Sequence, residues 1–283
     1  MKRIFLSLLL AGGLVCSVAA QQTVELNLLH TSDMHSRIEP ISPQAADANA
    51  GLGGVVRRAT LVKHFRAEHP DALLFDCGDI SQGTPYYNLF RGELEVKMMN
   101  LMHYDAMAIG NHEFDFGLDN MARLFRMADF PVVCANYDVT GTVLEGLVKP
   151  YVILERDGLK IGVFGLGPKL EGLVASANCE GITFNNPFEV AQQTADLLKE
   201  QMGCDLVVCL SHLGISNEDP EGFDDLRLVA RTRNIDVVLG GHSHTFMEKP
   251  QMLGNADGRE IPLLHSGKSG VYVGRMEVTL QAK

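Results

Sequence analysis

The chain has 283 residues, which is enough for one large domain or two small ones. Because 46% of its residues are hydrophobic and 21% are charged, it can bury a sizeable core and is neither a disordered nor a collagen-like chain. Its formal net charge is −11, and no segment concentrates lysine or arginine into a surface for a phosphate backbone, which argues against a nucleic-acid partner.

The first 20 residues have the layout of a cleaved secretory signal: two basic residues, an apolar run and a small-residue end. We expect a secreted, periplasmic protein that begins near Gln21 and has no membrane span after cleavage. The loss of Lys2 and Arg3 takes the formal charge from −11 to −13. A membrane anchor is less favoured because the apolar run is short for a span of roughly 20 residues. A lipid anchor on Cys16 is less favoured because the residues before it fit the lipidation signal poorly.

Five cysteines remain after that cleavage, an odd number with no C-x-x-C spacing. The pattern therefore indicates neither a disulfide framework nor a thiolate zinc site. We expect most of them to be small core residues. They are Cys77, Cys134, Cys179, Cys204 and Cys209.

Along the chain, apolar strands that end in polar residues alternate with stretches of helical periodicity. The expected strands lie at about 24–33, 71–79, 106–110, 131–138, 151–157, 158–167, 204–213, 235–244, 261–267 and 272–281. The expected helices lie at about 53–69, 89–102 and 187–202, and another starts near Gly117. A turn at 157–158 predicts a hairpin. The alternation is typical of an α/β fold, and since no repeat, low-complexity run or Pro-rich linker divides it, we expect one domain over residues 21–283.

Polar side chains fall at one kind of place, the carboxyl end of a predicted buried strand. Five of the expected strands end in Asp or His, and in open α/β sheets the ligand crevice lies beyond such ends. Asp33 and His35 are separated by one residue, as are His242 and His244. Alternate side chains of an extended chain point the same way, so each pair is expected to reach one centre.

The candidate ligands at these ends combine carboxylate oxygens, imidazole nitrogens and one amide oxygen, without cysteine. They are Asp33, His35, Asp79, Asn111, His212, His242 and His244. This set suits manganese, zinc, iron or cobalt and does not suit calcium. It is too large for one tetrahedral ion, and it predicts two divalent ions that share a carboxylate.

Each of these residues has an ordinary structural explanation when it is taken alone. An Asp after a strand is more often a helix cap or a turn residue, and a lone His is more often hydrogen-bonded structure. The coincidence favours a site, since five of the ten histidines and two aspartates stand at strand ends. The other five histidines do not share that position. They are His30, His64, His69, His103 and His265.

Five motifs in order, SDMHS, CGD, GNHEFDFG, LSHLG and GGHSHT, resemble those of the catalytic domain of the 5'-nucleotidase family, within the calcineurin-like metallophosphatases. The resemblance runs from about Val24 to the C-terminus. It implies a four-layer αββα sandwich, with two mixed β-sheets packed together and flanked by helices. It also implies how the ligands divide. One ion would be held by Asp33, His35, Asp79 and His244, and the other by Asp79, Asn111, His212 and His242. Relatives often have Gln at the position of His244.

The same resemblance implies a phosphohydrolase that releases phosphate from phosphomonoesters, nucleoside 5'-phosphates above all, by in-line attack of metal-bound hydroxide. His112 is carried into the site beside Asn111, and we expect it to act as a cation facing the phosphoryl group or the leaving oxygen. Asp115 matches the family's carboxylate that pairs with this histidine; its alternative role is a cap on the helix near Gly117. Glu113 receives no role.

Longer members of the family carry a second, C-terminal domain whose aromatic residues clamp the nucleoside base, whereas this chain stops at Lys283. We expect either that a separate chain supplies such a domain or that the leaving group is loosely selected. With no Trp and 7% aromatic residues, the sequence offers no obvious substitute platform for stacking. Two alternatives stay open: a phosphodiesterase for cyclic nucleotides or similar diesters, and a metal-loaded subunit that needs a partner chain.

Overall fold

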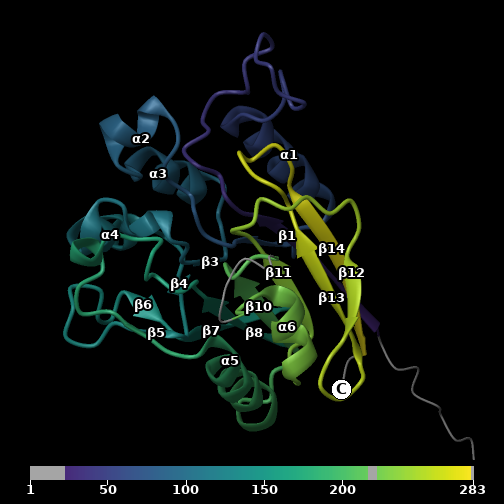
Figure 1. Ribbon diagram of the computed structural model, residues 1–283. Coiled ribbons are helices and arrows are strands. Elements are labelled where there is room, and N and C mark those ends of the chain that lie inside the picture. Colours follow the sequence, from purple (N-terminus) through teal and green to yellow (C-terminus); the bar gives the residue numbers. More distant parts are fainter. Residues whose placement is uncertain (1–22, 216–221, 282–283) are drawn as a thin grey trace, which may run out of the picture.

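The computed structural model describes residues 23–215 and 222–281 (Figure 1). The expected secretory signal, residues 1–20, lies outside these ranges. Within them, no helix combines the length and the apolar composition that crossing a membrane requires.

Two six-stranded sheets contain most of the described strands. The first has the order β14-β1-β2-β3-β4-β6, with β1 at Thr23–Thr31, β2 at Leu73–Asp76, β3 at Ala106–Ala108, β4 at Val132–Val133, β6 at Val148–Lys149 and β14 at Gly274–Gln281. The second has the order β12-β13-β11-β10-β8-β7, with β7 at Tyr151–Arg156, β8 at Leu159–Leu166, β10 at Leu206–Ser211, β11 at Val237–Gly240, β12 at Gln251–Gly254 and β13 at Glu260–His265. Two short strands, β5 (Tyr137–Asp138) and β9 (Thr183–Phe184), form a small third sheet.

Both large sheets are mixed, with parallel strands inside and antiparallel strands at edges. β1 pairs with β2, β2 with β3, β3 with β4 and β4 with β6 in parallel, as do β8, β10, β11 and β13 in the second sheet. β14, β7 and β12 pair antiparallel with their neighbours. The carboxyl ends of the parallel strands therefore lie together along one edge of each sheet.

Helices cover the outer faces of the two sheets (Figure 1). On the first sheet lie α1 at Val55–Glu68, α3 at Glu93–Leu101 and α4 at Gly117–Met127; on the second lie α5 at Pro187–Asp196 and α6 at Asp225–Arg231. Shorter elements are α2 at Pro85–Phe90, the 3₁₀ turns η1 at His112–Phe114 and η2 at Ser176–Asn178, and the π-helical turn η3 at Leu197–Gln201.

The strands are apolar on both faces, and this requires four layers. In β1, Leu28 packs between the two sheets while Leu29 packs under the helices of the first sheet. In β10, Val208 packs between the sheets while Val207 packs under the helices of the second. Successive side chains of a strand point to opposite faces, so strands of this kind are stable only when both faces are covered. The predicted four-layer αββα sandwich is confirmed.

The single helix expected at 89–102 is wrong, because the structure has two helices there. α2 ends at Phe90, and Arg91 and Gly92 have left-handed φ angles of 52° and 90° before α3 begins. The φ angle of 90° at Gly92 is one that residues with a side chain rarely adopt, so this position favours glycine. The helical periodicity of the sequence continues across the break and hides it.

The single strand expected at 131–138 is also wrong. Its first part is β4 in the first sheet and its last part is β5 in the small sheet. Between them, the side chain of Asn136 accepts a hydrogen bond from the Gly167 N–H and donates one to the Gly167 carbonyl, each at 2.8 Å. These bonds redirect the chain toward the second sheet.

The predicted hairpin is confirmed: β7 and β8 pair antiparallel around Asp157 and Gly158, which have φ angles of 49° and 76°. The expectation for the cysteines is also confirmed within the described ranges. None of these five cysteines forms a disulfide among the described residues; four are buried, and Cys179 is partly exposed.

Candidate metal centre

Polar side chains from both sheets meet at the carboxyl ends of the parallel strands. Asp33 and His35 follow β1, Asp79 follows β2, Asn111 follows β3, His212 follows β10, and His242 and His244 follow β11. Because the two sheets pack face to face, these residues come together from both halves of the chain.

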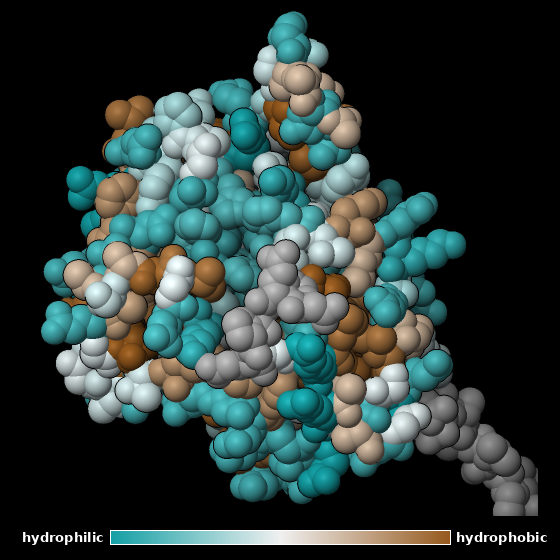
Figure 2. All heavy atoms as spheres, in the orientation of Figure 1, coloured by the Kyte–Doolittle hydropathy of each residue, from teal (hydrophilic) through white to brown (hydrophobic). Residues whose placement is uncertain are grey.

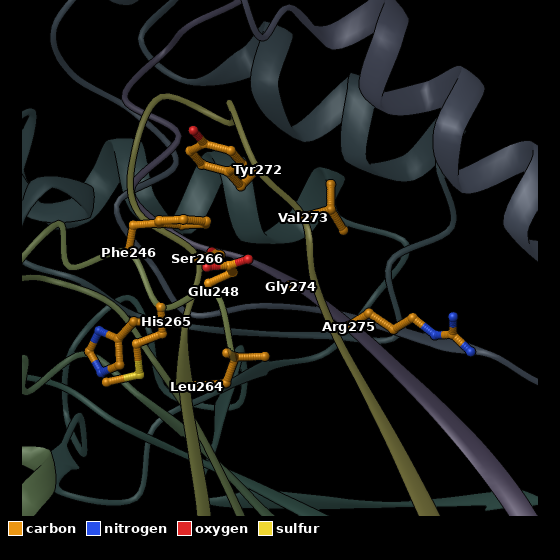
Figure 3. Close-up of a pocket in the computed structure, with 10 residues that line it drawn as sticks. Phe246, Glu248, Leu264, His265, Ser266, Tyr272, Val273, Gly274 and Arg275 are labelled. Atoms are coloured by element: carbon orange, nitrogen blue, oxygen red, sulfur yellow. The ribbon is translucent and has the colours of Figure 1, made fainter. Parts of the chain in front are cut away.

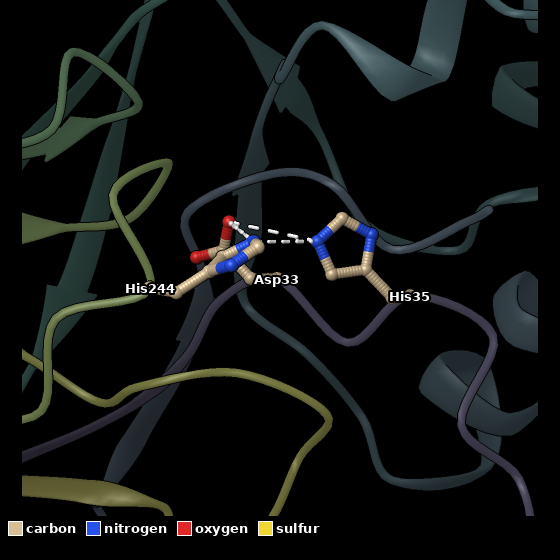
Figure 4. A group of neighbouring side chains, drawn as sticks. All are labelled: Asp33, His35 and His244. Carbon is tan, nitrogen blue, oxygen red and sulfur yellow. Dashed lines mark hydrogen bonds and ion pairs between the residues drawn. The ribbon is translucent and has the colours of Figure 1, made fainter. Parts of the chain in front are cut away.

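Six of these residues form two groups, in each of which one potential ligand atom per residue lies within 4.8 Å of the others. The first group is Asp33, His35 and His244 (Figure 4), and the second is Asp79, His212 and His242. In the first, His244 Nε2 lies 2.9 Å from His35 Nε2 and 3.5 Å from Asp33 Oδ1. In the second, Asp79 Oδ2 lies 3.0 Å from His212 Nε2.

The two groups adjoin each other. Asp33 Oδ1 is 4.0 Å from His212 Nε2 of the other group, and the backbone N–H of His242 donates to both carboxylate oxygens of Asp33, at 3.0 and 3.1 Å. Asn111 lies beside Asp79, because the backbone N–H of the next residue, His112, donates to Asp79 Oδ1 at 2.8 Å. The seven candidate ligands thus form one centre, and the H-x-H pair divides between its two groups.

The backbone at these ligands is not extended. Asp33, His35, Asp79, His242 and His244 have φ angles between 48° and 72°. We expected extended backbone to point Asp33 and His35 at one centre, and likewise His242 and His244, and that backbone geometry is wrong. Asp33 and His35 do share a group. Left-handed backbone costs about 1–3 kcal/mol at a non-glycine residue, and such strain gathers at functional sites. Tight backbone turns therefore direct these candidate ligands toward the centre.

Hydrogen bonds between loops hold these turns in place. The Asp33 N–H donates to the Gly78 carbonyl at 2.9 Å, and the His35 N–H donates to the Asp79 carbonyl at 3.1 Å. His212 Nδ1 lies 2.6 Å from the Cys77 carbonyl. Since that carbonyl can only accept, Nδ1 carries the proton and Nε2 faces the centre, as in metal-ligating histidines.

The carboxylates of the centre are buried without a strong cation. Burial raises the pKa of Asp33 to about 6. Burial also acts to raise the pKa of Asp79, but its contact with His212 outweighs that effect and holds the pKa below the usual range. Asp79 in turn overcomes the burial of His212 and raises its pKa to about 10. In the described ranges, neither Asp33 nor Asp79 forms an ion pair with lysine or arginine. Positive charge at this place must come from protons or from metal ions.

The donor atoms fit divalent cations. Asn111 Oδ1 is buried and has no hydrogen-bond partner among the described residues, whereas buried polar atoms nearly always have one. His212 Nε2 is also buried, and it contacts the Asp79 carboxylate at 3.0 Å. Burial lowers the pKa of His35 and of His242 to about 4 each, which keeps both imidazoles neutral and able to ligate at neutral pH. Oxygen and imidazole donors without a thiolate suit manganese, zinc, iron or cobalt.

His112 lies at the edge of this centre with a carboxylate behind it. Its Nδ1 is 2.9 Å from Asp115 Oδ2, and its ring centroid is 5.4 Å from that of His35. The Asp115 hydrogen bond raises the pKa of His112 above its ordinary value, against the opposite effect of burial. Both side chains are 28% exposed. The structure therefore places a histidine that favours its protonated form where a substrate can reach it.

Glu113 is the residue that the sequence left without a role. Its carboxylate accepts hydrogen bonds from the backbone N–H groups of Asp79, Ile80 and Gly110, at 3.0, 2.9 and 2.6 Å. It is buried, and burial raises its pKa to about 7. It ties the loop after β2 to the loop after β3, beneath Asp79 and Asn111. Only its position in the turn after Asn111 could have indicated this, because it points away from His112.

The surface beside the centre has a hydrophilic region and an apolar region. Figure 2 shows mostly hydrophilic residues between the helices α2–α4 and the strands β12–β14, and apolar residues over those strands. The exposed apolar residues include Phe246, Met252 and Tyr272. A recess of about 260 Å³, which Phe246, Tyr272, Glu248 and Arg275 help to line, lies there (Figure 3). None of the candidate metal ligands lines it, so this recess is separate from the centre.

A family model described as calcineurin-like phosphoesterase matches residues 26–246. A snake venom 5'-nucleotidase of Crotalus adamanteus is 35% identical over 94% of this chain and 47% of its own length. The chain thus spans about half the length of this curated relative.

Two solved structures have the same fold. The 5'-nucleotidase precursor of Thermus thermophilus superimposes with a TM-score of 0.81 and 31% identity, over 92% of this chain and 53% of that one. The calcineurin-like phosphoesterase YfkN of Bacillus subtilis superimposes with a TM-score of 0.77 and 27% identity, over 93% of this chain and 87% of that one.

Proposed function

Because the chain belongs to the calcineurin-like phosphoesterase family, we propose that it releases phosphate from phosphomonoesters, in particular from nucleoside 5'-phosphates. Its homology to the N-terminal catalytic domain of 5'-nucleotidases makes it a metal-dependent phosphoric ester hydrolase. The observation that carries the proposal is the pair of adjoining ligand groups at the strand ends, beside a buried amide oxygen, Asn111 Oδ1, that lacks a hydrogen-bond partner among the described residues.

Two divalent ions are the cofactors in this proposal, with manganese, zinc, iron and cobalt as the candidates. Asp33, His35, Asp79 and His244 would hold one ion, and Asp79, Asn111, His212 and His242 the other. Asp79 is the shared ligand in this proposal, which is supported by its place in the second group and by the hydrogen bond that its backbone carbonyl accepts from His35 of the first. When bound, the ions supply positive charge for the phosphate oxygens and lower the pKa of water.

The protein's own contribution to catalysis in this proposal is a fixed cation on the leaving-group side. His112 holds a proton at the ring nitrogen that does not face Asp115, and that nitrogen donates to a phosphoryl oxygen or to the leaving oxygen. Asp115 orients the ring and keeps it charged, which its 2.9 Å contact with Nδ1 supports. Because Asp79 accepts from the His112 backbone, ring and metal ligands keep a fixed spacing.

We also propose that residues 1–20 direct secretion to the periplasm. The basic, apolar and small-residue regions of that segment support this, and so does the similarity to a venom protein, which is a secreted protein.

Phosphate release by the purified protein tests the proposed function. Metal-free protein is loaded with Mn²⁺, Zn²⁺ or Co²⁺ and offered AMP, ribose 5-phosphate, an aryl phosphate and cyclic AMP. We expect phosphate from the monoesters, and its loss in Asp79→Ala. Asp236→Asn is the matched control, because Asp236 is also a buried carboxylate but binds Lys199 and Arg259 at the opposite strand ends.

Cleavage of cyclic AMP without phosphate release from any monoester would replace this proposal by the phosphodiesterase. Activity that appears only after a separately expressed, aromatic-rich partner is added would instead support the partner-dependent subunit.

A further inference from the structure

The turn that carries His112 also presents an aromatic ring beside the site. Residues 111–115 form one helical turn, so Asp115 and Phe116, three and four residues after His112, lie near the same side of it. Glu113 and Phe114 are buried on the other side, while Phe116 is only partly buried. The metal-facing turn therefore continues into a partly exposed phenyl ring.

Tyr87 of the separate helix α2 and Arg91, the residue that follows this helix, both pack on this ring. The Tyr87 ring centroid is 4.7 Å from that of Phe116, with the planes tilted by 39°. The Arg91 guanidinium carbon lies 4.8 Å from the Phe116 centroid. The Tyr87 hydroxyl also faces Asp115: burial and this carboxylate together raise the pKa of Tyr87. The cluster of Tyr87, Phe116 and Arg91, here called the aromatic wall, thus touches the carboxylate that orients His112.

The wall is held in place by the break between α2 and α3. Arg91 ends α2 in the left-handed conformation, with its N–H donating to the Tyr87 carbonyl at 2.8 Å. Its own carbonyl accepts from the Asn120 side chain of α4 at 3.0 Å. The guanidinium is exposed, and within the described ranges it lies at ion-pair distance from no carboxylate. A positioned, solvent-facing guanidinium plane is available to a ligand.

We propose that Tyr87, Phe116 and Arg91 bind the planar base of a nucleotide whose phosphate lies at the metal centre. Aromatic rings and guanidinium planes stack on bases without selecting one base strongly. This inference rests on the proposed function, which puts the leaving oxygen at His112, the side chain adjacent to the wall. It also revises the expectation that the chain lacks a stacking platform: the platform comes from two segments that are separate in sequence and meet only in the fold.

A second aromatic pair on the other flank serves as the internal control. Phe246 and Tyr272 stack at 4.0 Å and 25°, and they are 49% and 36% exposed. Phe246 follows His244, whose ring lies 5.0 Å from that of His35, whereas His112 lies 5.4 Å from His35. Of the two aromatic pairs, the aromatic wall contacts the Asp115–His112 pair, and α2, which carries Tyr87, lies apart from β13 and β14 in Figure 1.

The test compares AMP with ribose 5-phosphate, which has the same phosphate and sugar but no base. We expect the wild type to prefer AMP, and Phe116→Ala and Arg91→Ala each to lower kcat/KM for AMP about tenfold while leaving ribose 5-phosphate unchanged. Arg91→Lys keeps the charge but loses the plane, so it should behave like Arg91→Ala. Phe246→Ala should keep the preference for AMP.

A binding experiment that needs no metal separates this inference from the proposed function. Saturation-transfer NMR of metal-free protein with adenosine should give a signal that Phe116→Ala and Arg91→Ala weaken and Phe246→Ala does not. That result together with no hydrolysis of any monoester would support the base site and refute the proposed function. Equal losses on AMP and ribose 5-phosphate, rescue by Arg91→Lys, or loss of the AMP preference in Phe246→Ala would each overturn the base site.

Discussion

The two ends of the sandwich both bury carboxylates, but they neutralise them differently. At the amino ends of the strands, Asp236 binds Lys199 and Arg259, each at 2.8 Å, and Asp105 binds Arg66 and Arg156. At the carboxyl ends, Asp33 and Asp79 meet only histidines in the described ranges. The first end is complete as a protein structure. At the second end, the negative charge of the buried carboxylates is balanced only when protons or metal ions bind.

This contrast shows that the partner of a buried carboxylate helps to distinguish a structural position from a ligand-binding one. A buried carboxylate with its own arginine or lysine contributes to specific folding, and breaking such a pair costs about 3–5 kcal/mol. A buried carboxylate whose only ion-pair partners among the described residues are histidines, beside the unpartnered amide oxygen of Asn111, indicates a ligand instead.

The largest expected effect concerns His112, a cation that only the carboxyl-end site uses. His112→Asn should lower kcat about a thousandfold, because it removes the group placed at the transferring phosphoryl. Two metals should stay bound, as measured by metal analysis of the purified variant. The matched neighbour Asn111→Ala should weaken one ion. If His112→Asn lost a metal and kept its turnover, the division of roles within this turn would be wrong.

Metal-dependent stability should belong to the carboxyl end alone. Mn²⁺ at a thousand times its dissociation constant should raise the free energy of unfolding by about 4 kcal/mol per site. Asp79→Asn should lose most of this gain, while Asp236→Asn should unfold more easily yet keep the gain. Denaturant titrations with and without Mn²⁺ measure both. A gain that vanished in Asp236→Asn would contradict the separation of the two ends.

Glu113 sharpens the comparison, because it is a carboxyl-end carboxylate that binds backbone groups and no metal-facing atom. Glu113→Gln replaces one acceptor oxygen by a donor that faces the N–H groups of Asp79 or Gly110. We expect metal affinity to fall about 10- to 100-fold, as for other groups that position metal ligands. Metal titrations monitored by calorimetry measure this. An unchanged metal affinity together with a lower free energy of unfolding would show that Glu113 stabilises the fold without positioning the metal ligands.

The smallest predicted effect concerns His30, which lies in β1 one residue before the carboxyl end of the strand. It is fully buried, both ring nitrogens lack partners, and burial together with His265 lowers its pKa from 6.5 to about 3. The fold therefore binds the neutral form. Its contribution is complete above pH 6.5 and is lost progressively as the pH falls from 6.5 toward 3, by about 2 kcal/mol at pH 5.

His30→Leu removes this titration. Acid titrations of unfolding free energy should show a shallower loss between pH 6.5 and 5 in the variant than in the wild type. Identical slopes would show that His30 is not a source of acid sensitivity.

Much of the fold was predictable because it depends on local pattern. The strands are apolar on both faces, and this periodicity marked β1, β2, β10 and β11 correctly. The break at Arg91 and Gly92 was not predictable, because the periodicity runs through it, while the left-handed backbone there is tied to α4 by the hydrogen bond from the Asn120 side chain to the Arg91 carbonyl. The division of residues 131–138 between two sheets likewise depends on bonds between Asn136 and Gly167.

The candidate site was likewise predictable in part. The identities of the ligands followed from residue type and from position after a strand. Their left-handed backbone did not, because it arises from contacts between loops, such as that of Asp33 with Gly78. The role of Glu113 depends on two loops that are adjacent only in the folded chain.

By itself, the sequence determined the α/β class, the succession of strands along the chain and the kinds of ligand atom at their carboxyl ends. Periodicity and residue chemistry are properties of neighbouring residues, so they can be read without the fold. Only the tertiary structure decided which carboxylates would be left without lysine or arginine, that left-handed turns would carry the candidate ligands, and that Phe116 would meet Tyr87 and Arg91 beside His112. The physical reason is that charge compensation and stacking depend on distances across the sandwich, and these distances are set by packing.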